Sequence, residues 1–220
     1  PRGLLFPPHQ LALAQRAGDP RRLARALAGE AVYQASRGPE HLARANQLLQ
    51  RARVAQRDLD DPELGATIAV ADGVLAYREG RFHAAQAQLE QLERRLREQH
   101  RDVAWELAVT QRFALMAVMY QGDYLAEARL LPTYQASAQR RGDAFAGLNM
   151  RVHGVRLALV HDDAARARRD LAGLLDAWRG RDVEMAKLQE LVTRSWLASY
   201  DGNLDELRAL PRELTLRRLT

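Results

Sequence analysis

Hydrophobic residues recur at steps of three and four along most of this chain. One such series is Phe82, Ala85, Leu89, Leu92 and Leu96. A second series is Ala104, Leu107, Ala108, Gln111, Leu115, Val118 and Met119. No stretch of useful length alternates apolar and polar residues with a period of two. The pattern therefore predicts an all-α protein.

Two interleaved series of turn residues divide the chain into about five copies of one unit. One series is Gly38, Gly80, Gly122, the Asp162-Asp163 pair and Gly202, with spacings of 42, 42, 40 and 40 residues. The other is Asp19-Pro20, Asp61-Pro62, Asp102, Asp143 and Asp182, with spacings of 42, 41, 41 and 39 residues. Each unit thus consists of a helix, a tight turn and a second helix, followed by a capping residue that begins the next unit. We predict a right-handed solenoid of about five antiparallel helix pairs, with a period of about 41 residues.

The same signals predict where the helices begin and end. We expect helices near 8–17, 20–37, 40–57, 62–79, 81–99, 103–121, 123–140, 144–160, 163–179 and 183–200, then a short stretch from Asn203 that Pro211 interrupts. An Asp before Pro is typical of a helix start, because the carboxylate accepts a bond from an orphan N–H and proline needs no donor there. Glycine at the turns supplies the left-handed conformation that ends a helix.

Composition narrows the class of protein. The chain has 47% hydrophobic but only 6% aromatic residues, and no Cys, which excludes disulfides, thiolate metal sites and thiol catalysis. Its apolar runs, such as 113–120, are far shorter than the roughly 20 residues that cross a membrane, and no signal peptide pattern opens the chain. We therefore expect a cytoplasmic protein without membrane contact.

Because residue 1 is Pro rather than Met, we interpret 1–220 as a single repeat domain cut from a larger multidomain protein. Truncation would leave apolar helix faces uncovered at the ends of such a domain, so a homodimer formed through one of these ends is a further alternative.

The charge of +5 and the pI near 10 first suggest a polyanion partner. However, Lys187 is the only lysine, a bias typical of a GC-rich coding genome. Arginine runs such as Arg94-Arg95-x-Arg97 and Arg166-x-Arg168-Arg169 are interrupted at helical spacing by the acidic residues Glu90, Glu93, Glu98 and Asp170. This pattern favours solvated helix faces over a nucleic-acid track.

Several short motifs resemble tetratricopeptide repeats. Gly80-Arg81-Phe82-x-x-Ala85 and Gly122-Asp123-Tyr124 look like the turn and second-helix start of that family, and Gly73 matches its helix-packing glycine. The units here are longer than the family's 34 residues. The whole chain is similar to the helical-repeat region that follows the kinase domain and a predicted ATPase module in certain large bacterial Ser/Thr protein kinases. The matching stretches are Arg2-Gly3, Leu13-Ala14, Arg16 to Pro20, Ala24 to Ala28, Glu30-Ala31 and Val103 to Leu107. Sensor regions of large bacterial transcription activators share this architecture.

Catalytic and metal-binding patterns are missing from the sequence. It has no Gly-rich phosphate loop followed by Lys and no His-Glu-x-x-His, and its six histidines are scattered. The acidic group Asp58, Asp60, Asp61 and Glu63 resembles a calcium loop but lacks its glycine and distal Glu, so we interpret it as helix capping. The serines show no convincing pattern with a general base and a third residue that would orient that base, as nucleophilic catalysis requires. We expect no catalytic residues, no metal and no cofactor, and any kinase or ATPase activity would lie outside this segment.

A binding function needs a surface, and the resemblance indicates one. In tetratricopeptide-like stacks the first helices of each pair line a groove, and the matching positions here are Tyr77, Arg78, Arg112, Met116, Tyr120, Asn149, Arg156, Gln189, Trp196 and Tyr200. Packing between pairs is an equally good account of Tyr77, Met116 or Trp196 taken singly. Arg112 and Arg156 interrupt apolar stripes, although snorkelling or pairing with a carboxylate such as Asp72 would explain them. Trp105 is assigned to packing between repeat units.

These observations lead to three hypotheses. The first is a non-catalytic protein–protein interaction module, a sensor or scaffold region of a bacterial signalling protein, most simply a Ser/Thr kinase. Its partner would be a protein or peptide segment, including another domain of the parent chain. The second is a nucleic-acid-binding helical repeat, whose affinity would fall steeply with salt. The third is a small-molecule sensor pocket between helix pairs, as in the sensor region of a transcription activator.

Overall fold

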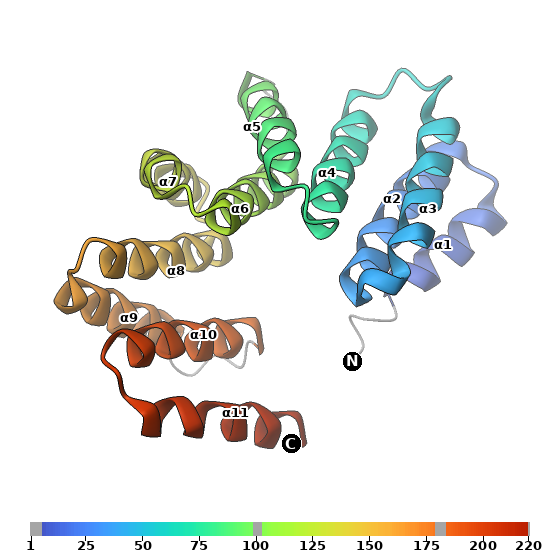
Figure 1. Ribbon diagram of the computed structural model, residues 1–220. Coiled ribbons are helices and arrows are strands. Elements are labelled where there is room, and N and C mark those ends of the chain that lie inside the picture. Colours follow the sequence, from blue (N-terminus) through green and yellow to red (C-terminus); the bar gives the residue numbers. More distant parts are fainter. Residues whose placement is uncertain (1–5, 99–102, 179–183, 220) are drawn as a thin grey trace. The chain divides into compact units, whose positions relative to one another are not determined.

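A computed structural model describes residues 6–98, 103–178 and 184–219 of the chain. Helices make up nearly all of these residues, and no strand occurs among them, so the all-α prediction is confirmed (Figure 1). Contacts between residues divide the chain into two compact units, 1–123 and 124–220, called unit 1 and unit 2 below. Within the described ranges, no helix combines the length and the apolar character that crossing a bilayer requires.

The described residues of unit 1 form six α-helices and a short 3₁₀ turn. They are α1 (Phe6–Ala17), α2 (Pro20–Arg37), η2 (Pro39–His41), α3 (Leu42–Gln56), α4 (Pro62–Arg78), α5 (Phe82–Glu98) and α6 (Ala104–Gln121). Successive helices pack against each other, and α4 also packs against α2 and α6. Small and branched apolar side chains of α2, α3 and α4, such as Ala31, Leu48 and Leu75, form a common core. Alanine in this core lets the helix axes approach closely.

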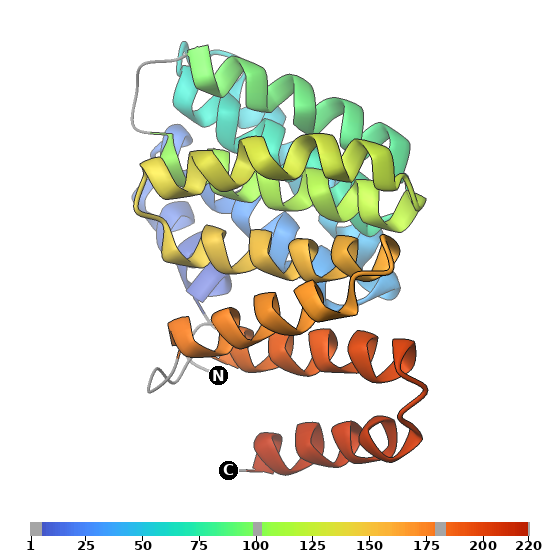
Figure 2. The ribbon, with the colours of Figure 1, turned by 90° about the vertical axis from the view of Figure 1, so that its left-hand side faces the viewer.

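In the part of unit 2 that the structure describes, there are five helices. They are α7 (Tyr124–Arg140), α8 (Ala144–Val160), α9 (Ala164–Trp178), α10 (Glu184–Tyr200) and α11 (Leu204–Leu219) (Figure 2). Helix α8 packs against α7, α9 and α10, and α10 packs against α9 and α11. In both units, therefore, helices about one predicted period apart are in contact. Most helix ends lie within two residues of the predicted ones.

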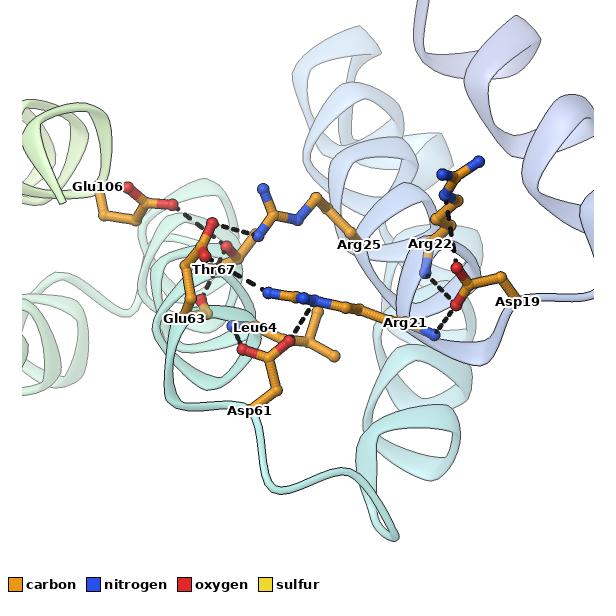
Figure 3. Close-up of polar contacts among 9 residues, drawn as sticks. All are labelled: Asp19, Arg21, Arg22, Arg25, Asp61, Glu63, Leu64, Thr67 and Glu106. Atoms are coloured by element: carbon orange, nitrogen blue, oxygen red, sulfur yellow. Dashed lines mark hydrogen bonds and ion pairs between the residues drawn. The ribbon is translucent and has the colours of Figure 1, made fainter. Parts of the chain in front are cut away.

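Asp side chains cap the helices where the sequence predicts. Asp19 accepts a hydrogen bond from the backbone N–H of Arg21 at 2.9 Å, and Asp61 accepts one from Leu64 at 3.0 Å (Figure 3). Asp143 caps α8 in the same way. These caps are confirmed, including the interpretation of Asp61 as a cap. The predicted caps Asp102 and Asp182, and the stretch Arg2-Gly3, lie outside the described residues.

Charged side chains join neighbouring helices of unit 1 (Figure 3). The guanidinium of Arg25 on α2 donates to Glu63 on α4 at 2.5 Å, and Arg21 pairs with both Asp61 and Glu63. The hydrogen bond and charge of Arg25 lower the pKa of Glu63. One step further, the Thr67 hydroxyl of α4 donates to the buried Glu106 of α6 at 3.2 Å. Polar contacts thus continue from α2 through α4 to α6.

The turns follow the prediction with one exception. Gly80, Gly122 and Gly202 have φ of 77°, 71° and 66°, the left-handed region in which glycine ends a helix without steric cost. Asp162 takes the same role with φ of 59°. Gly38 differs, because its φ of 142° and ψ of 169° lead into η2 rather than directly into a helix. The helix predicted from residue 40 therefore begins at Leu42.

Two further predictions are wrong. Pro211 lies inside α11, which continues to Leu219. Proline in a helix interior removes one backbone donor and usually kinks or breaks the helix. Here the helix nevertheless continues past the exposed Pro211, and α7 likewise contains the exposed Pro132. Trp105 is 61% exposed, so it does not pack between repeat units. It lies in the first turn of α6, on the opposite side from the buried Leu107 and Thr110.

Candidate functional site

Four aromatic rings of unit 1 form one cluster. Tyr77 lies near the end of α4, Phe82 begins α5, and Phe113 and Tyr120 lie on α6. The Tyr77 ring is central, with its centroid 5.6 Å from Phe82, 5.3 Å from Phe113 and 5.8 Å from Tyr120. Phe82 and Tyr120 stack with centroids 5.2 Å apart and planes 14° apart. These edge-on and stacked arrangements are the ones that aromatic pairs prefer.

Two arginines lie over this cluster. The Arg78 guanidinium carbon is 5.7 Å from the Tyr77 centroid and 5.8 Å from the Phe113 centroid. The Arg112 guanidinium carbon is 5.7 Å from the Phe113 centroid. A guanidinium over a ring face within about 6 Å is attracted by the ring quadrupole. We call the whole set the aromatic–arginine patch; it consists of Tyr77, Arg78, Phe82, Arg112, Phe113 and Tyr120.

The patch has a buried base and an accessible edge. Tyr77 and Phe113 are buried, whereas Arg78 is exposed and Tyr120 is 57% exposed. Burial, with the nearby Tyr120, raises the pKa of Tyr77 to about 12. Burial and the charge of Arg78 lower the pKa of Arg112. The arrangement therefore offers positive charge and aromatic surface from fixed positions, which are the properties of a typical anchor site for a bound chain.

In unit 2 the predicted Arg156 belongs to a buried ionic group. Glu127 of α7 is fully buried and accepts from the Arg156 guanidinium through one carboxylate oxygen. Its other oxygen lies 2.6 Å from Nδ1 of the buried His153. The Arg156 guanidinium carbon also lies 5.0 Å from the Tyr124 centroid, and burial lowers the pKa of Arg156. A neighbouring carboxylate therefore accounts for Arg156, although that carboxylate is Glu127. Asp72 instead pairs with Arg53.

The other predicted residues of unit 2 have internal partners. Gln189 donates to the buried Asn149 at 2.5 Å, linking α10 to α8. Half-buried Trp196 packs against the cluster that contains Leu148. Tyr200 donates to Asp162 through its hydroxyl.

The structure thus brings together four predicted residues, Tyr77, Arg78, Arg112 and Tyr120, and separately joins Asn149 to Gln189. Met116 is half-buried on α6. Phe82 and Phe113 were missed as site members, although Phe82 could have been found because it directly follows the Gly80 turn. Nothing in the sequence distinguishes the buried Glu127 from exposed glutamates on similar helices.

Comparison with known proteins places the fold among all-helical proteins. The crystal structure of BtubC (BKLC) from P. vanneervenii superposes with a TM-score of 0.67 at 18% sequence identity, covering 99% of this chain and 90% of that one. At this identity the likeness shows a shared fold only. No protein-family model matches the chain. No curated protein matches it either.

Proposed function

We propose that this chain is a non-catalytic protein-interaction module built as a tetratricopeptide-like solenoid of about five helix pairs. Contacts between α2 and α4, α4 and α6, and α8 and α10 support the repeat, since each pair of helices is about one period apart. The Asn149–Gln189 hydrogen bond joins residues 40 positions apart, close to the predicted period. Gly73 supports the likeness further, because a Cβ built on it would lie 2.6 Å from Cγ of Leu89 on the paired helix.

The aromatic–arginine patch carries the proposal of binding. Its rings offer large, rigid contact area, and its guanidiniums offer paired donors for a carboxylate. The chemistry that fits is a peptide segment with an acidic side chain next to an apolar or aromatic one. The resemblance to bacterial Ser/Thr kinases supports a sensor or scaffold role in signalling, with the segment supplied by another protein or by another domain of the parent chain.

An array of synthetic peptides with systematically varied acidic and aromatic positions tests this function. We expect bound peptides to require at least one carboxylate, and the double variant R78Q/R112Q to weaken them by about tenfold or more. The control R129Q/R169Q removes the same charge from exposed positions of unit 2 and should bind as the parent protein does. Mass spectrometry should recover the bound peptides chemically unchanged.

If R78Q/R112Q and R129Q/R169Q weaken peptide binding equally, net charge alone explains the effect. That result would contradict the assignment of the binding site to the patch. Failure of every peptide to bind would contradict the proposed function itself.

A further inference from the structure

A cleft of about 440 Å³ opens in unit 2 between α7, α8 and α9. Helices α7 and α9 both pack against α8, which forms the floor of the cleft. Its polar lining consists of Gln135, Gln139, Arg151, His161, Arg166 and Asp170. A second hollow of about 250 Å³ adjoins it and shares Gln139, Gly147 and Arg151. Cavities of this size hold small organic ligands in other proteins.

The cleft is open because α8 has glycine where it faces the space. A Cβ built on Gly147 would meet no atom within 4 Å. One built on Gly154, two turns later, would meet only Asp170 Oδ2 at 3.9 Å and Gln135 Nε2 at 4.0 Å, which are ordinary contacts. Packing in unit 2 therefore does not require either glycine. In a helix interior each glycine costs up to about 1 kcal/mol relative to alanine, so the open space is maintained against helix propensity.

Several polar side chains around the cleft have no polar partner in the described part of the chain. Among the residues that the structure describes, the side chains of Arg151, Gln135 and Gln139 make no hydrogen bond or ion pair. Arg166 has a carboxylate neighbour, with its Nε 3.6 Å from Asp170 Oδ2. The lining thus contains one carboxylate and two guanidiniums, which leaves a surplus of positive charge and several unused donors. Leu131 and Leu157 add apolar surface to the same lining.

We propose that this cleft binds a small organic anion, a carboxylate or phosphate group attached to an apolar body. Arg151 would hold the anionic group through paired N–H donors, because a guanidinium matches the oxygens of both groups. Gln135 and Gln139 would donate to the remaining oxygens, and Leu131 and Leu157 would contact the apolar part. Gly147 and Gly154 would let the ligand approach the α8 backbone. This site lies within unit 2 and is independent of the aromatic–arginine patch.

Amide NMR of the full chain tests the site, because the Gly147 and Gly154 signals report on its floor. The probes are benzoate and phenyl phosphate, with benzamide as the neutral isostere and inorganic phosphate as the anion without an apolar body. We expect both aromatic anions to shift the two glycine signals in a saturable way, and benzamide to bind at least about tenfold more weakly. Whichever of the two anions binds more tightly shows whether the site prefers a carboxylate or a phosphate group. Inorganic phosphate should bind more weakly than phenyl phosphate.

Two variants test the residues. R151Q should weaken benzoate or phenyl phosphate by about tenfold or more, whereas R129Q, on an exposed position of α7 that does not line the cleft, should not. G147L should fill the cleft and abolish binding while the protein stays at least as stable as the parent. The matched control G29L changes an exposed helix glycine of unit 1 that also has free space around it, and should retain binding. Unshifted glycine signals with both anions, or unchanged binding by G147L, would overturn the proposal.

Discussion

Gly73 lies where α4 packs tightly against Leu89 of α5. A Cβ at this position would run into the side chain of Leu89, which is fully buried and so has little room to move. Overpacking of this kind costs about 1–3 kcal/mol, whereas replacing a helix glycine by alanine gains up to about 1 kcal/mol. The clash outweighs the gain, so the resemblance to the helix-packing glycine of tetratricopeptide repeats has a physical reason here.

We therefore expect G73A to lower the free energy of unfolding by about 1 kcal/mol, measured by urea denaturation. G29A is the matched control, because a Cβ on Gly29 meets nothing within 4 Å. That variant should be more stable than the parent by up to about 1 kcal/mol. The two changes are chemically identical, and finding the same sign for both would contradict the close approach at Gly73.

Tyr77 makes the patch sensitive to alkaline pH. Its pKa of about 12 in the folded protein exceeds the value near 10 of an unfolded tyrosine. The unfolded chain therefore loses this proton first, and the stabilisation, complete below pH 10, is lost as the pH rises towards 12. Denaturation curves at pH 9 and pH 11 should show a smaller stability loss for Y77F than for the parent protein. Equal losses would mean that Tyr77 titrates as it does in the unfolded chain.

At the scale of elements, the fully buried Glu127 links α7 to α8 through His153 and Arg156. Removing one member of a buried ionic group leaves the others without compensation, at a cost of about 3 kcal/mol or more. We expect E127A to lower the free energy of unfolding by this amount, measured by chemical denaturation. E40A changes an exposed glutamate and should lie within about 0.5 kcal/mol of the parent. A small effect of E127A would mean that water reaches Arg156 once the carboxylate is removed.

The elements themselves were largely predictable because their signals are local. Asp61 and Asp143 cap their own helices, and Gly122 ends its own, so neighbouring residues suffice to locate these ends. The predictions failed where a residue type that usually has one structural role has another role in this fold. Pro211 removes one donor without ending α11. Trp105, assigned from the sequence to packing between repeat units, lies on the exposed face of α6.

At the scale of the whole molecule, the arginine-rich composition raises the question of nucleic acid. Several arginines are already neutralised by neighbours on their own helix, such as Arg97 by Glu93 and Arg166 by Asp170, as the interrupted runs predict. We expect fluorescence anisotropy with DNA and RNA oligonucleotides to show no binding at 150 mM salt, and at most weak binding at 20 mM that salt removes. Tight binding with a steep salt dependence would instead favour a nucleic-acid-binding repeat.

The sequence by itself determined the helical class and the positions of most turns, because capping, glycine conformation and apolar periodicity act within a few residues of the chain. Only the tertiary structure decided which of the predicted site residues meet. It brought Tyr77, Arg78 and Arg112 to Phe113 and placed Tyr120 against Tyr77, and it paired Arg156 with the buried Glu127. Those contacts depend on the rotation of each helix about its axis and on the side chains opposite, which are set by packing between residues distant in the chain.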